Sequence, residues 1–223
     1  MAGGPVFSMT STRRQDFQMC QYLLLEYFRI YLKLAPVPAA RTALRCVDPF
    51  VEENHVRRHL NEGFSVADVT TEFAFRGGTA QYMRDSSFIW DRGSDPYEPT
   101  QMADDVRRTI GELAESPEAS ATLDLVLNLF RDEVRSAFLW RRLIGATTDH
   151  PDRFVNQAYE LSIAEPLLVG PDTVHEMGQL FAVFSEKFSV VQRESVETFI
   201  LALPKSCQEE YREGRTRVRN RLL

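Results

Sequence analysis

One spacing in this chain brings together side chains that commonly bind metal ions. Glu52, His55 and His59 stand at i, i+3 and i+7, which places them on one face of an α-helix. Carboxylate and imidazole groups are frequent ligands of zinc and related metals. Arg57 and Arg58 lie in the same segment and would oppose a cation. Because spacing alone is weak evidence, we expect a solvated helix face here, with a metal site as the alternative.

Sequence motifs of catalysis and nucleotide binding are missing. The chain contains no HExxH, GxSxG, GxxxxGK[ST] or GxGxxG, so Gly77-Gly78 does not read as a phosphate-binding loop. Helical proteins can carry catalytic carboxylates without leaving a motif. We therefore expect a protein that is not an enzyme and needs no cofactor, and keep a helical enzyme with buried carboxylates as an alternative.

Residues 91–100, DRGSDPYEPT, combine glycine, serine, two prolines and several acids. Three carboxylates loosely suggest calcium, but the segment lacks the glycine and the terminal glutamate of an EF-hand loop. This composition is typical of a loop. We expect an acidic linker between two subdomains.

The C-terminal residues are rich in arginine. Arg215, Arg217, Arg219 and Arg221 alternate along the chain, so on a helix they would spread around its axis. An extended segment could instead contact phosphates. Because the chain as a whole carries a net charge of −6, we expect a solubilising terminal helix. A nucleic-acid-binding regulator is the third functional hypothesis.

Aromatic residues gather at two places. Phe88 and Trp90 stand beside the acidic loop, and Phe184 and Phe188 stand in the C-terminal half. Core packing explains such residues in most proteins. Aromatic anchors also dominate interface energetics, so these four residues are the candidates for contact with a protein partner.

Composition indicates a globular protein of the cytoplasm. Of the 223 residues, 43% are hydrophobic and 26% are charged, which are ordinary globular values. Cys20, Cys46 and Cys207 are far apart and form no CxxC pair, as is typical of a reducing compartment. The start of the chain does not read as a secretion signal. The longest apolar run, 22–35, contains three charges, so we expect no membrane span.

The first helix is predicted to follow a flexible leader, 1–11, and to run from Thr12 to about Leu34. Glu26, Arg29 and Lys33 form one narrow polar stripe on it. A helix with so little polar surface needs cover on at least two sides, so we expect it at the centre of the core. Prolines then predict a second helix over 39–47, a break at Asp48-Pro49 and a third helix over 51–60.

Residues 64–75 are ambiguous. Val66, Val69 and Phe73 fit a helical face, whereas Thr71, Phe73 and Phe75 alternate as in a strand. The helical surroundings favour a helix. A further short helix is predicted over 79–90, after the glycine pair.

The C-terminal half predicts successive short helices. They begin near Pro117, Pro151, Pro171 and Ser189, and Ser189 with Gln192 fits a capping box. Helices separated by short proline-marked turns are typical of stacked hairpins. We predict an all-α, α-solenoid-like protein of the HEAT or armadillo kind, with a helical subdomain over 12–92, a loop over 93–100, a helical-repeat subdomain over 101–205 and a basic tail over 206–223.

Three features of this half carry a family resemblance. They are a tryptophan-bearing helix, Phe138-Leu-Trp140-Arg-Arg-Leu-Ile; the restart Asp149-His-Pro151; and the helical segment 184–204, ending Ile-Leu-Ala-Leu-Pro. Together they resemble the α-helical repeat region of large bacterial STAND/NACHT-type NTPases. Such proteins join a nucleotide-binding module to a solenoid that senses a ligand, and several act in antiviral defence. The chain departs from them in having no nucleotide-binding module, so the resemblance implies no ATPase residue here.

The sequence therefore favours a non-catalytic helical-repeat module that binds another protein. The resemblance implies the sensor or scaffold segment of an NTPase-linked system, with an NTPase as one possible partner. Nucleic acid and membrane are not expected as partners.

Overall fold

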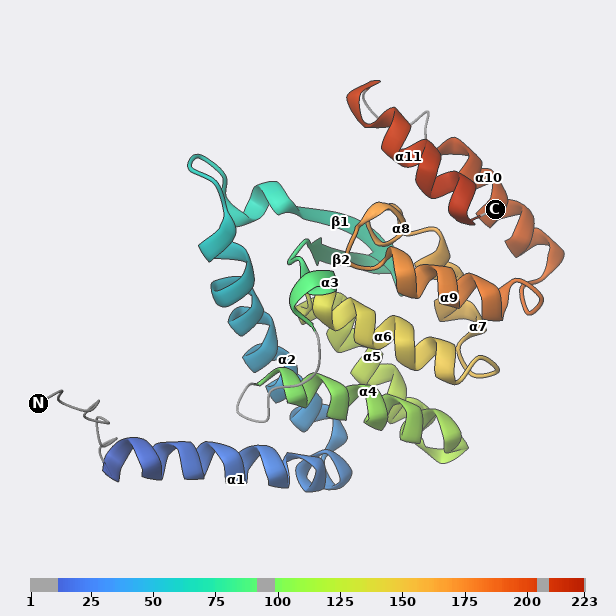
Figure 1. Ribbon diagram of the computed structural model, residues 1–223. Helices are drawn as coiled ribbons and strands as arrows, with labels where there is room; N and C mark the ends of the chain where they lie inside the picture. Colours follow the sequence, from blue (N-terminus) through green and yellow to red (C-terminus); the bar gives the residue numbers. More distant parts are fainter. Residues whose placement is uncertain (1–11, 92–98, 204–208, 223) are drawn as a thin grey trace, which may run out of the picture.

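The computed structural model describes residues 12–91, 99–203 and 209–222. Helices dominate it, and one small antiparallel hairpin packs against them (Figure 1). In the described ranges, no helix is both long enough and apolar enough to cross a bilayer. The helices are α1 (Thr12–Leu34), α2 (Pro36–Val51), α3 (Ser87–Trp90), α4 (Thr100–Glu115), α5 (Ser120–Glu133), α6 (Ala137–Asp149), α7 (Val155–Ser162), α8 (Glu165–Val169), α9 (Val174–Phe184), α10 (Val190–Ala202) and α11 (Glu209–Leu222), and the strands are β1 (Thr70–Phe75) and β2 (Gly78–Met83).

Helix α1 has the predicted bounds but not the predicted position. It lies at one end of the molecule, with its N-terminal half projecting away from the other helices (Figure 1). It packs on α2 and α4 along one side, where Leu25, Phe28 and Leu32 are buried. The expectation of a central, covered helix was wrong, because neighbouring elements occupy one side of α1 and most of its remaining apolar residues face outward.

Helix α2 continues through Asp48-Pro49, where the sequence predicted a break. Pro49 lies inside the last turn of α2 and lacks the N–H that would donate to the carbonyl four residues earlier, yet the helix continues past it. The chain then widens into a π-helical turn, Glu52–Val56, and tightens into a 3-10 turn, Arg57–His59. The segment predicted as a separate third helix, 51–60, is therefore helical as far as His59, but it continues directly from α2 as π and 3-10 turns.

Residues 64–75 are not a helix, and this prediction was also wrong. A 3-10 turn, Val66–Val69, leads into β1, which pairs with β2 in the register Thr70↔Met83 to Phe75↔Gly78. Arg76 and Gly77 connect the strands with φ values of 49° and 70°. Two consecutive positive φ values define the primed turn that matches strand twist. The predicted helix over 79–90 is consequently reduced to α3.

The buried face of the hairpin packs around one tryptophan. Trp140 on α6 is fully buried, and its ring lies 5.0 Å from Phe73 and 5.4 Å from Phe75. Its indole N–H donates to the carbonyl of Gln81 at 2.8 Å. One continuous apolar cluster extends from α1 through this centre to α10.

The C-terminal helices follow the predicted order. Helices α5, α7, α9 and α10 begin within a few residues of the four predicted starts. The capping box at α10 is confirmed, because Ser189 and Gln192 bond to each other's backbone N–H at 3.3 and 3.0 Å. Between the predicted helix starts at Pro151 and Pro171 the chain forms two helices, α7 and α8, which are divided ahead of Pro166.

Candidate functional site

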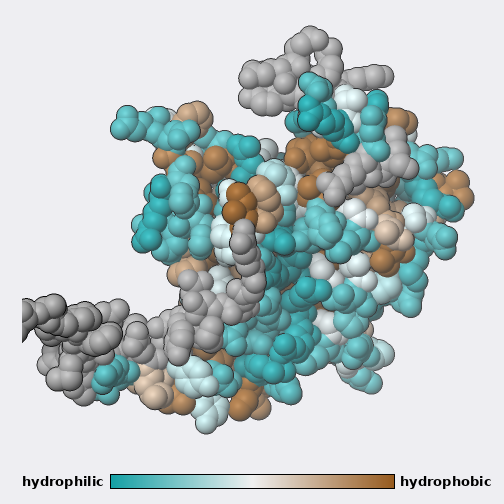
Figure 2. All heavy atoms as spheres, viewed as in Figure 1, coloured by the Kyte–Doolittle hydropathy of each residue, from teal (hydrophilic) through white to brown (hydrophobic). Residues whose placement is uncertain are grey.

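The most exposed apolar surface in the described ranges lies on α1. Eight large hydrophobic residues of this helix are exposed, and Leu24 and Leu34 reach 74% and 80%. Soluble monomers rarely leave so many on one element, and large apolar patches usually mark interaction sites. We refer to this surface as the outer face of α1, made of Met19, Tyr22, Leu23, Leu24, Tyr27, Ile30, Tyr31 and Leu34. Brown and tan atoms mark apolar residues at the lower edge of Figure 2, where α1 lies.

The opposite side of α1 fixes the helix on the body. Beside its three buried apolar residues, Arg29 forms an ion pair with Asp105 of α4 at 3.6 Å. Burial raises the pKa of Asp105, and Arg108 pairs with the same carboxylate at 3.3 Å. The Arg29–Asp105 pair and the three buried apolar residues hold α1 in place, while its outer face remains exposed.

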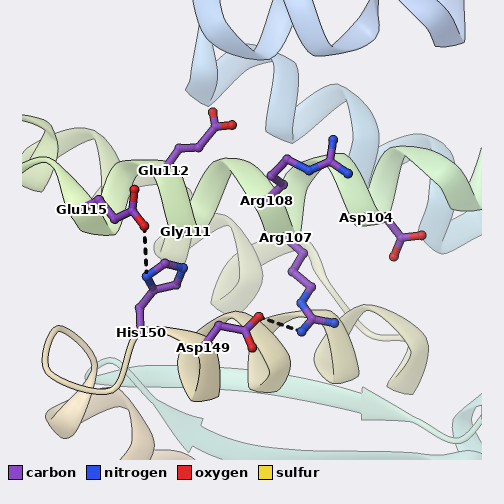
Figure 3. Close-up of a pocket in the computed structure, with 8 residues that line it drawn as sticks. All are labelled: Asp104, Arg107, Arg108, Gly111, Glu112, Glu115, Asp149 and His150. Atoms are coloured by element: carbon purple, nitrogen blue, oxygen red, sulfur yellow. Dashed lines mark hydrogen bonds and ion pairs between the residues drawn. The ribbon is translucent and has the colours of Figure 1, made fainter.

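A second feature is an open cleft of about 510 Å³ between α4 and the end of α6 (Figure 3). His150 lies against Gly111 of α4, and its Nδ1 is 3.8 Å from the carboxylate of Glu115. Arg107 pairs with Asp149 across the cleft at 2.7 Å. The Arg107–Asp149 ion pair and the contact of His150 with Glu115 join α4 to the end of α6, so we interpret the cleft as a polar junction between these helices.

Of the predicted metal ligands, two have protein partners in the structure. Glu52 accepts from Arg57 and from Arg135, the latter at 2.6 Å. His55 stacks on Trp90 instead of facing Glu52. His59 closes the 3-10 turn. In the described ranges, no three His, Cys, Asp or Glu side chains gather in a way that could hold a metal ion. Glu52, His55 and His59 do not share one helix face, because this segment is not an α-helix.

The environment of His55 also disfavours a charged imidazole. Burial lowers its pKa, and the nearby positive charges of His59 and Arg58 lower it further. Its Nε2 is buried without a hydrogen-bond partner. The ring therefore serves as a neutral, flat packing surface.

Two buried carboxylates form a junction that sequence reasoning did not find. Asp85 accepts from the backbone N–H of Ser87 at 2.9 Å and of Phe138 at 2.8 Å. Burial, helped by the nearby charge of Asp172, raises the pKa of Asp85 to about 7. Asp172 in turn accepts the backbone N–H of Phe88 at 3.4 Å, and burial raises its pKa. Because backbone amides occupy these carboxylates, we interpret the pair as a structural link between α3, α6 and α9. No sequence pattern distinguished them from other aspartates.

A cluster of ion pairs surrounds Arg141 and Arg142 on α6. Both guanidinium groups bond to Asp91, which immediately precedes the undescribed residues 92–98. Arg142 also bonds to Asp104 of α4 at 2.8 Å, and Arg141 to Glu176 of α9 at 2.7 Å. The acidic segment proposed as a linker falls mostly on residues 92–98, so that prediction lies outside the described residues.

The predicted partner-binding aromatics do not share one surface. Phe88 is 53% exposed, whereas Trp90 is partly buried against the core. Phe184 and Phe188 are buried and stack with centroids 5.9 Å apart. Of these four residues only Phe88 offers a docking surface. Sequence reasoning missed the outer face of α1 because it treated that apolar surface as core.

The predicted phosphate-binding arginines lie on α11. Arg215 pairs with Glu165 of α8, Arg217 with Glu213, and Arg219 bonds to Asn220. The side chain of Arg221 lies outside the described residues. The three described guanidinium groups therefore have acceptors within the protein.

No protein-family model, curated protein or solved structure matches this chain. The fold and the surfaces above are therefore the basis for a functional assignment.

Proposed function

We propose that this chain is a non-catalytic protein-interaction module whose binding surface is the outer face of α1. One observation carries the proposal: eight large apolar side chains are exposed on a helix that other contacts hold in place. Burying such side chains against a partner is favourable at roughly 25 cal/mol per Å², and the fixed helix loses little conformational freedom on binding.

We also propose that the C-terminal helices form a short array of stacked hairpins. Support comes from their packing: α6 contacts α7 and α9, α7 contacts α9 and α10, and α10 contacts α11. In such arrays each unit packs mainly on its neighbours. Helix α1 lies outside this array and packs on α2 and α4.

The proposal also includes the cellular system in which the protein acts. The resemblance to the repeat region of STAND/NACHT-type NTPases makes a sensor or scaffold role in an NTPase-linked system the reading we favour. An NTPase is then the first class of partner to seek, ahead of nucleic acid or membrane.

The test is an affinity pull-down from the native cells after nuclease treatment, with proteins identified by mass spectrometry. The full chain should retain a stoichiometric protein through α1, and Leu23→Glu/Ile30→Glu should lose it. A matched control is Val191→Glu/Leu201→Glu on α10, where both residues are also exposed. Recovery of the same proteins with both double variants would reject α1 as the binding surface.

A further inference from the structure

The outer face of α1 contains the spacing of a coiled-coil seam. Cys20, Leu23, Tyr27, Ile30 and Leu34 recur at intervals of three and four residues, which is the a/d pattern of a heptad repeat. All five are exposed. The seam lies opposite the three apolar side chains that α1 buries against the body. Helix α1 therefore has two apolar sides, one already packed and one spaced to receive another helix.

We propose that the occupant of this seam is α1 of a second copy of the same chain, which gives a two-fold symmetric dimer. This inference rests on the proposed function, and it places a second copy of the chain, ahead of an NTPase, on the outer face of α1. A two-fold interface requires a patch that matches itself, and an a/d seam satisfies this requirement because each apolar residue of the seam can pack against the seam of an identical helix.

Half of the large exposed apolar residues of α1 lie on the seam itself. These four side chains, Leu23, Tyr27, Ile30 and Leu34, each contribute on the order of 100 Å², which gives about 400 Å² on each copy. A standard protein–protein interface buries about 800 Å² per partner. The seam thus supplies about half of such an interface, and the exposed residues Leu24 and Tyr31 beside it extend the apolar contact.

Charges beside the seam favour the antiparallel orientation. Glu26 and Lys33 are exposed and flank the seam on one side, seven residues apart. When Leu23 faces Leu34 of the partner subunit, Tyr27 faces Ile30 of the partner subunit. Glu26 then lies beside Lys33 of the partner subunit, and symmetry repeats this pair. A parallel pair would place Glu26 near Tyr31 and leave both charges without opposite partners.

Packing on the body lowers the cost of pairing. Contacts with α2 and α4 hold the part of α1 that carries Leu25, Phe28 and Leu32, and in proteins such packing supplies most of a helix's stability. Two copies therefore dock preformed surfaces, which reduces the ordering cost of association.

The first experiment measures the mass of the purified full chain by light scattering, from about 1 to 100 μM, a range suited to micromolar dissociation constants. The expected result is a dimer that Leu23→Glu/Ile30→Glu converts to a monomer with unchanged circular dichroism. Val191→Glu/Leu201→Glu should remain dimeric. A monomeric wild type, or a dimer that persists in Leu23→Glu/Ile30→Glu, overturns the proposal.

The second experiment tests orientation by oxidative crosslinking in a Cys20→Ser background. A mixture of Tyr27→Cys and Ile30→Cys chains should crosslink more than either chain alone, because these positions face each other in the antiparallel pair. Efficient Cys20–Cys20 crosslinking in the wild type would show a parallel pair and overturn the antiparallel arrangement.

The pull-down separates this inference from the proposed function. A monomeric wild type that still retains a protein through α1 overturns self-pairing and leaves the interaction role intact. A monomer with no α1-dependent partner overturns both.

Discussion

The imidazole of His55 stacks on the indole of Trp90, with ring centroids 3.9 Å apart and planes inclined by 13°. Trp90 stacks in turn on Phe138 at 5.0 Å, and Phe50 meets His55 edge-on at 6.0 Å. This aromatic stack joins the π-helical turn after α2 to α3 and to the start of α6. It gives the four-residue helix α3 a firm attachment, which its length alone would not provide.

The first prediction concerns this stack. Trp90→Ala should lower the free energy of unfolding by about 3 kcal/mol, since it removes a large, partly buried ring from between two others. Ile89→Ala is the matched control, because Ile89 is the exposed neighbour, and it should cost less than about 1 kcal/mol. Urea unfolding followed by circular dichroism measures both. Equal losses would show that the stack does not stabilise the fold.

His55 illustrates which part of a site the sequence could predict. Its spacing from Glu52 and His59 is a true property of the chain, but the common face required an α-helix. The π-helical turn after Pro49 changes the residues per turn, and Trp90, thirty-five positions later, takes the imidazole face. The spacing of Glu52, His55 and His59 predicts neither the π-helical turn nor the contact of His55 with Trp90.

The second prediction is a pH dependence of stability caused by Asp85. Burial raises its pKa from an ordinary value near 3.8 to about 7. Between these values the folded chain holds a proton that the unfolded chain has released. The contribution of protonated Asp85 to the free energy of unfolding is therefore complete below about pH 4. It falls by on the order of 1 kcal/mol per pH unit as the pH rises to about 7.

The measurement compares wild type with Asp85→Asn by urea unfolding at pH 5, 6 and 7. The lowered pKa of His55 acts in the opposite direction, but it is present in both proteins and cancels in the difference. The stability advantage of the wild type should shrink as the pH rises. Asp68→Asn is the control, because hydrogen bonds from Ser65 lower the pKa of Asp68, so its difference from wild type should stay constant. A constant difference for Asp85→Asn as well would disprove the assigned protonation.

Helix boundaries were predictable where local chemistry fixes them, as at Ser189 with Gln192. The hairpin was not, although Thr71, Phe73 and Phe75 alternate in the sequence. Its decisive residues are Arg76 and Gly77, whose positive φ values make the turn. Glycine permits that conformation but does not demand it, and the packing of Phe75 on Trp140 decides the outcome. The position of α1 was also not predictable, because an apolar pattern does not show whether the surface that buries it belongs to the same chain.

The third prediction contrasts two glycines. Gly77→Ala should destabilise the protein by about 1 kcal/mol, because alanine at a φ of 70° is strained. Gly178→Ala in α9 should stabilise it by up to about 1 kcal/mol, because its Cβ would enter open space on a helix. Thermal unfolding of the two variants should shift in opposite directions, and shifts of the same sign would contradict the assigned turn.

The fourth prediction tests how α1 is held. Phe28→Ala should lower the free energy of unfolding by about 3 kcal/mol, since its ring is buried against the body. Leu24→Ala should change it by less than about 0.5 kcal/mol, because Leu24 lies on the outer face. Both are measured on the Leu23→Glu/Ile30→Glu background, so that self-association does not contribute. If Leu24→Ala were as damaging as Phe28→Ala, α1 would have to be covered on both sides.

The fifth prediction concerns Gly111 and His150. A Cβ built on Gly111 lies 2.5 Å from Nε2 of His150, so Gly111→Ala must displace that ring from α4. The helix-forming advantage of alanine, about 1 kcal/mol, then opposes the cost of moving the imidazole and weakening its contact with Glu115. In the His150→Ala background the obstruction is gone, and Gly111→Ala should stabilise the protein by up to about 1 kcal/mol. Urea unfolding of the two single variants and the double variant forms a complete cycle. If the coupling free energy between the two substitutions were near zero, His150 would move aside without cost. Its close contact would then not explain the glycine at position 111.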